Sequence, residues 1–377
     1  MKETIAMRFV SHVLAASIML ACCGVARPIA AAEPVRLIFD TDMGNDIDDA
    51  LALAMIHALQ SRHECRLLTV TLSKDNAYAA PFVDLVNTFY GRGNIPVGRV
   101  KDGKTPDDGK YLKPVVDARN ADGKPLYPHH ITPESAIDSV MRGGKLTLYH
   151  PPETVAPEAV ALLRRTLAAQ PDGSVTIVMV GFSTNLARLL DSAPDEASPL
   201  PGHSLVARKV ALLSMMAGQF TKQGPPHAGE YNIIKDVPAA QKVVNEWPNL
   251  VVMSPWELGY AIKYPAVSIE RDYGYVAHHP VAEAYRLYMK FPYDRPTWDL
   301  TSALYAVRPD RGYFGLSESG TITITDTGKT EFTPSLKAMG RHRILTASPE
   351  QVTKTLEAMV CLCSQPPDEP QSKETKP

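Results

Sequence analysis

Apolar runs and helix-like repeats alternate along the first part of this chain. The run Val35–Phe39 precedes an amphipathic repeat over Ala50–Leu59, and Arg66–Leu72 precedes helical spacing over Ala79–Tyr90. A shorter apolar run, Ile95–Val100, follows. Short apolar runs are typical of buried strands, and the longer spaced repeats of helices. Strands that alternate with helices in this order predict a parallel sheet.

The alternation resumes after residues 101–152, which are rich in Asp, Gly, Pro and Lys. This segment is either a functional insertion or a plain surface excursion, and the sequence leaves both open. Further strands are predicted over Val175–Val180, Lys209–Met216, Leu250–Met253, Thr321–Thr325 and His342–Thr346. Further helices are predicted over Glu153–Gln170, Leu186–Leu190, Ala239–Glu246, Ala282–Lys290, from Pro296–Asp299 to Val307, and from Ser348 to about Cys363. We therefore predict an α/β fold in one domain, residues 34–360, with an open, mostly parallel, Rossmann-like sheet flanked by helices.

Residues 1–32 have the pattern of a secretory signal peptide. Basic residues precede an apolar stretch, Val10–Val25, and the small residues Ala30–Ala32 offer a cleavage site. The apolar stretch is short and interrupted, so no membrane span is predicted. We expect an exported protein, periplasmic or secreted. A lipid anchor at Cys22 or Cys23 is the less favoured alternative, because the flanking residues fit poorly. Residues 364–377 are predicted to form a disordered tail.

Composition and charge narrow the classes of partner. The chain is 45% hydrophobic and 21% charged, which is ordinary for a globular protein. Its net charge of −2 gives no reason to expect a nucleic acid or an anionic membrane as partner. Cys65, Cys361 and Cys363 remain after the leader, and this odd count does not build a disulfide framework.

Five carboxylates fall within ten residues, at Asp40, Asp42, Asp46, Asp48 and Asp49. Asp40 and Asp42 would point the same way at the carboxyl end of a strand, and Asp48 and Asp49 would open the next helix. Open α/β sheets bind ligands at that edge, so we expect the acids to converge on one crevice. A hard cation such as calcium or magnesium would offset their repulsion. The alternative is a solvated acidic turn with a helix cap.

Four segments together resemble one known family. Asp40–Ala50 resembles the amino-terminal signature of the inosine-uridine preferring nucleoside hydrolases. Val180–Ala187 is similar to their central Gly-x-x-Thr-Asn-x-Ala segment, Gly229–Asn232 to their Ala-Glu-Phe-Asn segment, and Trp298–Asp299 to their late His-Asp segment. The four segments occur in the order of the family and span nearly the whole chain after the leader.

The resemblance implies the nucleoside hydrolase fold and a bound Ca²⁺. The ion would be held by Asp42, Asp49, Asp299 and the main-chain carbonyl of Val180. The implied reaction is hydrolysis of the N-glycosidic bond of ribonucleosides to free base and ribose, as in purine or pyrimidine nucleoside salvage. Asp42 would also be the general base for the attacking water.

The resemblance also implies the groups that bind the nucleoside. Asp48, Asn232 and Asp299 would bind the 2′- and 3′-hydroxyls of the sugar. Glu230 would reach the 5′ side, and Asn76 matches the family's Asn after its second strand. Carboxylates around the sugar would stabilise the positive charge that develops as the bond breaks.

The chain departs from the family in four respects. Asp46–Ile47 lengthens the acidic turn by two residues, which makes Asp46 either a ligand or a loop cap. Trp298 replaces the His that donates a proton to the leaving base, and a Trp can only stack on that base. Gly224 lies where an Asn is common, and the chain carries a predicted leader. Candidates for a substitute acid, chosen by loop position, are Tyr127, His129, His130 and His227.

The sequence leaves three hypotheses for the function of the protein. The first is a calcium-dependent ribonucleoside hydrolase. The second is a hydrolase of a different ribosyl or glycosyl bond, since the leaving-group residue has changed. The third is a protein that binds ribose or a nucleoside without turnover. A phosphatase is disfavoured by the absence of a phosphate cradle. Base preference and homo-oligomer formation stay open.

Overall fold

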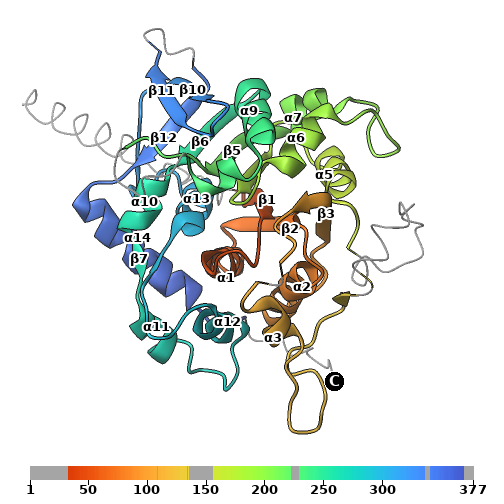
Figure 1. Ribbon diagram of the computed structural model, residues 1–377, viewed down its shortest axis with the longest axis vertical. Helices are drawn as coiled ribbons and strands as arrows, with labels where there is room; N and C mark the ends of the chain where they lie inside the picture. Colours follow the sequence, from red (N-terminus) through yellow and green to blue (C-terminus); the bar gives the residue numbers. More distant parts are fainter. Residues whose placement is uncertain are drawn as a thin grey trace, which may run out of the picture. The chain divides into compact units, whose positions relative to one another are not determined.

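A central β-sheet organises the described residues, which are 33–107, 109–133, 135, 156–221, 229–335 and 340–368 of this computed structural model. Its strands are β1 Val35–Thr41, β2 Cys65–Lys74, β3 Val97–Lys104, β4 Val175–Met179, β5 Val210–Met216, β6 Leu250–Ser254, β9 Gly315–Leu316, β10 Gly320–Ile324, β11 Thr330–Pro334 and β12 His342–Thr346. The strand order in the described part of the chain is β11-β10-β12-β6-β5-β4-β1-β2-β3, and β9 pairs with β12 (Figure 1). The strands from β12 to β3 are parallel, whereas β9, β10 and β11 add an antiparallel edge.

Helices cover both faces of this sheet. They are α1 Asp48–Ser61, α2 Ala79–Phe89, α3 Leu112–Val116, α5 Ala159–Ala168, α6 Thr184–Asp191, α7 Gly202–Lys209, α8 Tyr231–Ile234, α9 Val237–Glu246, α10 Trp256–Ala261, α11 Ala266–Arg271, α12 Pro280–Tyr288, α13 Trp298–Val307 and α14 Pro349–Cys363. A separate two-stranded antiparallel sheet pairs β7 Lys263–Tyr264 with β8 Arg295–Pro296.

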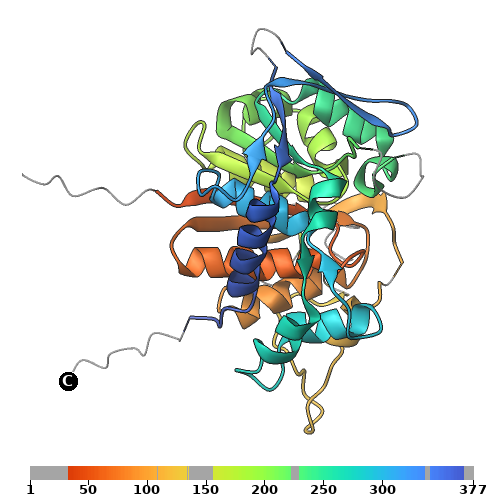
Figure 2. The same ribbon diagram turned by 90° about the vertical axis from the view of Figure 1, so that its left-hand side faces the viewer.

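Strand β1 divides the hydrophobic core into two layers. Leu37 and Phe39 pack with the residues of α1, α2 and α13 on one face, and Ile38 packs with those of α5, α6 and α9 on the other. Alternate residues of a strand point to opposite faces, so a run of apolar residues serves both layers. Figure 2 shows α14 lying alongside α1 in the first layer.

The packing of α13 brings a late segment of the chain beside the acidic turn. The hydroxyl of Ser214 in β5 donates to the carbonyl of Ser302 (2.9 Å), and Ser254 in β6 is hydrogen-bonded to Thr301 (2.5 Å). Helix α13 also packs against α1. The first turns of α1 and α13 therefore meet at the carboxyl edge of the sheet, although 250 residues separate Asp48 from Trp298 in sequence.

The predicted α/β class and mostly parallel sheet are confirmed. Strand β3 begins at Val97 rather than Ile95, and helix α5 begins at Ala159, after Glu158 caps it by accepting from the amide of Ala161 (2.9 Å). The pattern did not predict α3, α7, α11 or β11. These elements are short, and all but α7 hold five or six residues, too few for a clear period.

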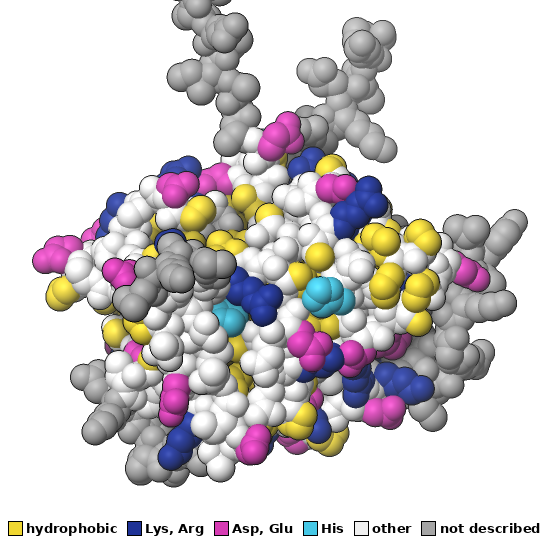
Figure 3. Space-filling view, turned by 90° about the horizontal axis from the view of Figure 1, so that it is seen from above, with side chains coloured by type: hydrophobic (Ala, Val, Ile, Leu, Met, Phe, Trp, Pro, Cys, Tyr) yellow, Lys and Arg dark blue, Asp and Glu magenta, His cyan; other side chains and the backbone are white. Residues whose placement is uncertain are grey.

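The described residues include part of the predicted C-terminal tail but none of the predicted leader. The predicted leader, residues 1–32, lies outside the described residues. Within the described ranges, no helix combines the length and apolarity that crossing a bilayer requires. Of the tail predicted to be disordered, Gln365 and Asp368 are described and accept hydrogen bonds from Arg62 and Arg92 (2.8 and 3.0 Å). On the face shown in Figure 3, acidic and basic side chains are interspersed.

Candidate active site

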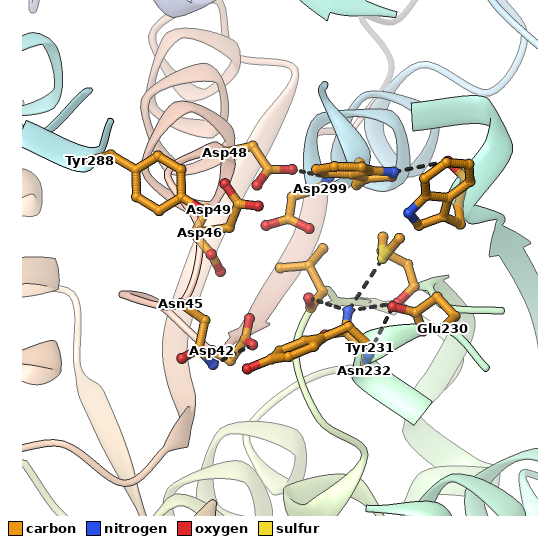
Figure 4. Close-up of a pocket in the computed structure, with 14 residues that line it drawn as sticks. Asp42, Asn45, Asp46, Asp48, Asp49, Glu230, Tyr231, Asn232, Tyr288 and Asp299 are labelled. Carbon is orange, nitrogen blue, oxygen red and sulfur yellow. Dashed lines mark hydrogen bonds between the residues drawn. The ribbon is translucent and has the colours of Figure 1, made fainter. Parts of the chain in front are cut away.

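A cavity of about 300 Å³ lies at the carboxyl edge of the parallel strands (Figure 4). Its walls come from the turn after β1, the ends of β4 and β5, and the beginnings of α8, α10 and α13. The lining residues are Asp42, Asn45, Asp46, Asp48, Asp49, Val180, Met216, Glu230, Tyr231, Asn232, Trp256, Tyr288, Trp298 and Asp299. A crevice at this edge is where open α/β sheets bind their ligands.

The turn between β1 and α1 places the first acids. The amide of Asn45 donates to the carbonyl of Asp42 (3.2 Å), and the amide of Met43 donates to Oγ1 of Thr41 (3.1 Å). Gly44 has φ of +111°, and a Cβ at that position would lie 2.4 Å from the side chain of Leu112. Glycine is therefore required there by both the backbone and the space.

Three carboxylates from both ends of the chain meet in the cavity. One oxygen from each of Asp48, Asp49 and Asp299 lies within 4.8 Å of the others, and all three side chains are buried. The amide of Asp299 donates to Oδ2 of Asp48 (3.0 Å), and the hydroxyl of Thr41 donates to Oδ1 of Asp49. No described group donates to Oδ2 of Asp49. A buried carboxylate oxygen without a donor, beside two other acids, fits a site for a hard cation.

Asp42 faces this trio across the cavity, as Figure 4 shows. Its Oδ2 accepts from Nδ2 of Asn45 (2.7 Å). Burial raises the pKa of Asp42 to about 6, the charge of Asp46 adds to that rise, and the charge of Lys74 opposes it. Burial likewise raises the pKa values of the three trio acids well above their usual range, and their mutual repulsion adds to the effect. The cluster therefore requires protons or a cation.

The end of β4 supplies the main-chain oxygen of Val180. This oxygen accepts from Nδ2 of Asn232 (2.9 Å) and, like the side chain, belongs to the cavity wall. A carbonyl oxygen has two lone pairs, so this bond leaves one for an ion. At the next residue, Gly181, a Cβ would lie 2.5 Å from the amide nitrogen of Asp42. Glycine thus lets β4 approach the acidic turn closely.

Glu230 is held by backbone amides at the opposite wall. Its carboxylate caps α8 and accepts from the amides of Asn232 (2.8 Å), Ile233 (3.3 Å) and Gly218 (3.3 Å). Burial raises the pKa of Glu230 to about 7 despite these hydrogen bonds. The three amides therefore fix the orientation of this side chain at the cavity wall.

Aromatic rings form the remaining wall. The indole N–H of Trp298 donates to the carbonyl of Trp256 (2.8 Å), and the centroids of their rings lie 6.2 Å apart. A Cβ at Gly259 would lie 2.4 Å from Cδ1 of Trp298, so the small residue makes room for the indole. Tyr288 and Tyr231 face the cavity from other sides. Because its only polar hydrogen is already engaged, Trp298 offers the cavity an apolar face.

Asp46 acts as an anchor of the lengthened turn. Arg295 binds both of its oxygens, with Nε at 2.8 Å from Oδ1, and also donates to the hydroxyl of Tyr288 (3.2 Å). The guanidinium lies over the rings of Tyr288 and Trp298, at 5.0 and 5.1 Å from their centroids. The hydroxyl of Tyr111 donates to the carbonyl of Asp46 (2.6 Å). Of the two roles that the sequence left open for Asp46, the structure favours fixing the loop.

Arg295→Met should lower the free energy of unfolding by about 1–3 kcal/mol, because it leaves the partly buried Asp46 carboxylate without its partner. Urea unfolding followed by circular dichroism measures the change. Arg208→Met is the matched control, since the pair of Arg208 with Asp172 is exposed and its loss should leave stability nearly unchanged. Equal effects of the two substitutions would show that the Asp46 pair does not anchor the turn.

Some residues singled out from the sequence do not line this cavity. Asp40 lies deeper in β1, where its Oδ2 accepts from Thr71 (2.5 Å) and Asn185 (2.8 Å). The expectation that all five acids converge is therefore wrong for Asp40. Asn76, expected on the sugar, is not a lining residue, and its side-chain amide donates to the carbonyls of Pro106 (3.2 Å) and Asp107 (2.9 Å).

None of the described residues that loop position suggested as substitute acids lines the cavity. Tyr127, His129 and His130 are not lining residues, and His130 instead lies 3.6 Å from the carboxylate of Asp84 in α2. His227 and Gly224 lie outside the described residues. In contrast, the other predicted site residues all line the cavity: Asp42, Asp48, Asp49, Val180, Glu230, Asn232, Trp298 and Asp299.

Several lining residues had no assigned role in the sequence analysis. Asn45 lies inside the acidic signature, and its position between the acids was the available signal. Tyr231 lies inside the Gly229–Asn232 segment. Met216, Trp256 and Tyr288 come from strand and helix ends that only the fold brings together.

Comparisons with known proteins agree with this geometry. Residues 37–357 match the family described as "Inosine-uridine preferring nucleoside hydrolase". The chain is 30% identical over 279 residues to the pyrimidine-specific ribonucleoside hydrolase RihA of Citrobacter koseri, a stretch that covers 71% of this chain and 75% of that protein.

Solved structures show the same fold at low sequence identity. A plant nucleoside hydrolase, PpNRh1, superposes with a TM-score of 0.61 at 18% identity, covering 88% of this chain and 100% of that one. The inosine-uridine preferring nucleoside hydrolase from Bacillus anthracis gives a TM-score of 0.60 at 18% identity, covering 88% and 99%. Since the family match extends over most of its length, the chain belongs to the inosine-uridine preferring nucleoside hydrolases, a metal-dependent family of enzymes that hydrolyse the N-glycosidic bond of ribonucleosides.

Proposed function

We propose that this protein is a calcium-dependent ribonucleoside hydrolase in which Asp42 is the general base. The observation that carries the proposal is the meeting of Asp48, Asp49 and Asp299, from the two ends of the chain, in the cavity that Asp42 also lines. Such a buried acid cluster is stable at neutral pH when a cation balances it.

Calcium would be held by Asp42, Asp49, Asp299 and the carbonyl of Val180. Calcium accepts many oxygen ligands in flexible geometry, which suits carboxylates from separate elements and a main-chain carbonyl. The donorless oxygen of Asp49 supports this assignment. When bound, the ion would supply positive charge that acidifies a nearby water molecule.

The other cavity residues would bind the sugar or take part in the reaction. Asp42 would accept a proton from the attacking water. Asp48, Asn232 and Asp299 would bind the 2′- and 3′-hydroxyls, and Glu230 the 5′ side. The carboxylates around the sugar would stabilise the positive charge that builds on it as the glycosidic bond breaks. The main-chain contacts of Glu230 and Asn232 would hold them ready for this task.

The leaving base would lie against the aromatic wall of Trp256, Trp298 and Tyr288. The indole N–H of Trp298 is engaged with the carbonyl of Trp256, so this residue would stack on the base rather than protonate it. The name of the RihA relative makes pyrimidine ribonucleosides the first substrates to test. The changed leaving-group residue also supports a second candidate, hydrolysis of a ribosyl bond whose leaving group requires no acid.

One assay separates the readings. Purified protein lacking residues 1–32, supplied with calcium, is given uridine, inosine and a chromogenic riboside, and the release of reducing sugar is followed. Turnover of uridine or inosine is the expected result. Turnover of the activated riboside alone would favour the second candidate. Absence of turnover, with ribose raising the melting temperature, would point to a binding protein instead.

We further propose that the protein acts outside the cytoplasm on scavenged nucleosides. The leader pattern over residues 1–32 supports this. Expression of the full chain in a bacterial host, followed by cell fractionation with a cytoplasmic enzyme as marker, tests this proposal. The protein is expected in the periplasmic or culture fraction, and recovery with the cytoplasmic marker would contradict the proposal.

A further inference from the structure

A lysine is buried behind the acidic turn. Lys74 ends β2, and its side chain is fully buried. Its ammonium donates three hydrogen bonds, to the carbonyl of Thr105 (2.6 Å), Oδ1 of Asn45 (2.9 Å) and Oδ1 of Asp107 (3.3 Å). The Asp107 side chain is 72% exposed, so its charge is well screened. The ammonium thus has two neutral acceptors and one weak ionic partner.

Burying an ammonium in this way is costly for the fold by itself. A buried charge normally has a buried, hydrogen-bonded counter-charge. The nearest acid cluster is the cavity, and Asn45 lies between it and Lys74. The burial of Lys74 is therefore better explained by an effect on the cavity acids than by a contribution to the stability of the fold.

Asn45 connects the lysine to Asp42. Its Oδ1 accepts from Lys74, and its Nδ2 donates to Oδ2 of Asp42 (2.7 Å) and to the hydroxyl of Thr105 (3.1 Å). An ammonium can only donate, so it fixes which end of the amide points toward it. The N–H₂ end must then face Asp42. If the amide were reversed, its oxygen would lie against the carboxylate and repel it.

We propose that Lys74 is a positioning residue, which acts through Asn45 to hold the carboxylate of Asp42 in the orientation required to bind the cation and accept a proton. The inference rests on the proposed function and deepens it. One oxygen of Asp42 is capped by Asn45, which leaves the other free to face the trio acids across the cavity. Outer partners of this kind orient the groups that contact a metal, and their loss typically lowers metal affinity or activity about 10- to 100-fold.

Calcium titration of the metal-free protein by calorimetry tests the inference, together with kcat and KM for the best ribonucleoside. Lys74→Met and Asn45→Ala should each weaken calcium binding and lower kcat by about 10- to 100-fold, with KM little changed. The double variant should bind calcium no more weakly, and have a kcat no lower, than the more impaired of the two single variants. The reason is that both changes break one chain of contacts. Lys74→Gln, which retains an N–H donor for Asn45, should recover most of the loss.

Arg164→Met is the matched control. Arg164 is another buried cation, bound to Ser192 (2.8 Å) and to the carbonyl of Ser198 (3.1 Å), and it lies outside the cavity. This variant should lose stability but keep the calcium affinity and kcat of the parent. If Lys74→Met merely resembles it, or if the effects of Lys74→Met and Asn45→Ala multiply in the double variant, Lys74 does not act through Asn45.

A separate measurement tests the role of Lys74 independently of the proposed function. The side-chain amide of Asn45 in ¹⁵N-labelled protein should give a shifted, slowly exchanging pair of signals in the parent, lose this protection in Lys74→Met and retain most of it in Lys74→Gln. Unchanged amide signals in folded Lys74→Met overturn the positioning role, whatever the activity of the parent. A parent with protected signals but neither calcium binding nor turnover would instead contradict the proposed function and, with it, the catalytic purpose of the positioning.

Discussion

Asp42→Asn should lower kcat for a ribonucleoside by about 10³- to 10⁴-fold, while the protein stays folded. The substitution keeps the shape of the side chain and one oxygen, but the amide cannot accept a proton from water at neutral pH. General base catalysis typically contributes about 10²- to 10⁴-fold, and weaker binding of the cation adds to the loss. Steady-state kinetics at saturating calcium measures the effect.

Asp84→Asn provides the control for removal of a buried carboxylate. Asp84 is buried in α2 and accepts from the amides of His130 and Ile131 (2.8 Å to the latter), away from the cavity. Its substitution should reduce stability and leave kcat almost unchanged. A kcat for Asp42→Asn within tenfold of the parent would remove Asp42 as the base, even if the fold and the cation site proved correct.

Removal of calcium should abolish turnover and also destabilise the fold. Without an ion, the cavity is lined by five buried carboxylates, at Asp42, Asp48, Asp49, Glu230 and Asp299. Calcium at 100 times its Kd should stabilise the protein by about 2.7 kcal/mol relative to the chelated form, and this gain should be visible as a higher melting temperature. Magnesium at the same concentration should restore less, because it demands a stricter geometry.

The stability of the metal-free protein should fall as pH rises. Burial raises the pKa of Asp42 from 3.8 to about 6 and that of Glu230 from 4.5 to about 7. Between about pH 4 and pH 7 the unfolded chain gives up these protons before the folded chain does, so each rise in pH favours unfolding. Below this window both states are protonated. Above it Asp42 and Glu230 are ionised in both states, and the raised pKa values of Asp48, Asp49 and Asp299 add to the loss.

Under the proposed function calcium would bind the ionised carboxylates, so it should act in the opposite direction. Its effect on the melting temperature should therefore be larger at pH 8 than at pH 5. Thermal unfolding at both values, with calcium or with a chelator, measures the difference. A metal-free protein that becomes more stable between pH 5 and pH 7, with no response to calcium, would contradict the cation site.

The acidic signature was sufficient to predict where the candidate cavity lies, but not which of the acids line it. Alternation of strand residues suggested that Asp40 would join Asp42 in the crevice. In the structure the strand continues one residue past Asp40 before the turn, so Asp40 stays within the sheet and is bound by Thr71 and Asn185. Where a strand ends is decided by its neighbours, and a single sequence does not show them.

The amino-acid order by itself determined the α/β class, the parallel core, the family, and the acids that open α1. The fold class and the position of the acids follow from local spacing: apolar runs, helical repeats and carboxylates around one Gly-containing turn. The family follows from the resemblance of four segments of the chain to its signatures. The resemblance also implied Asp299 as a partner of those acids, and the structure brings it beside them. Only the tertiary structure decided the other partners, namely Arg295 on Asp46 and Lys74 through Asn45. The reason is physical: a carboxylate interacts with whichever charge or donor lies within a few ångströms, and packing of α13 and β2 against β1 and α1 sets that distance, not separation along the chain.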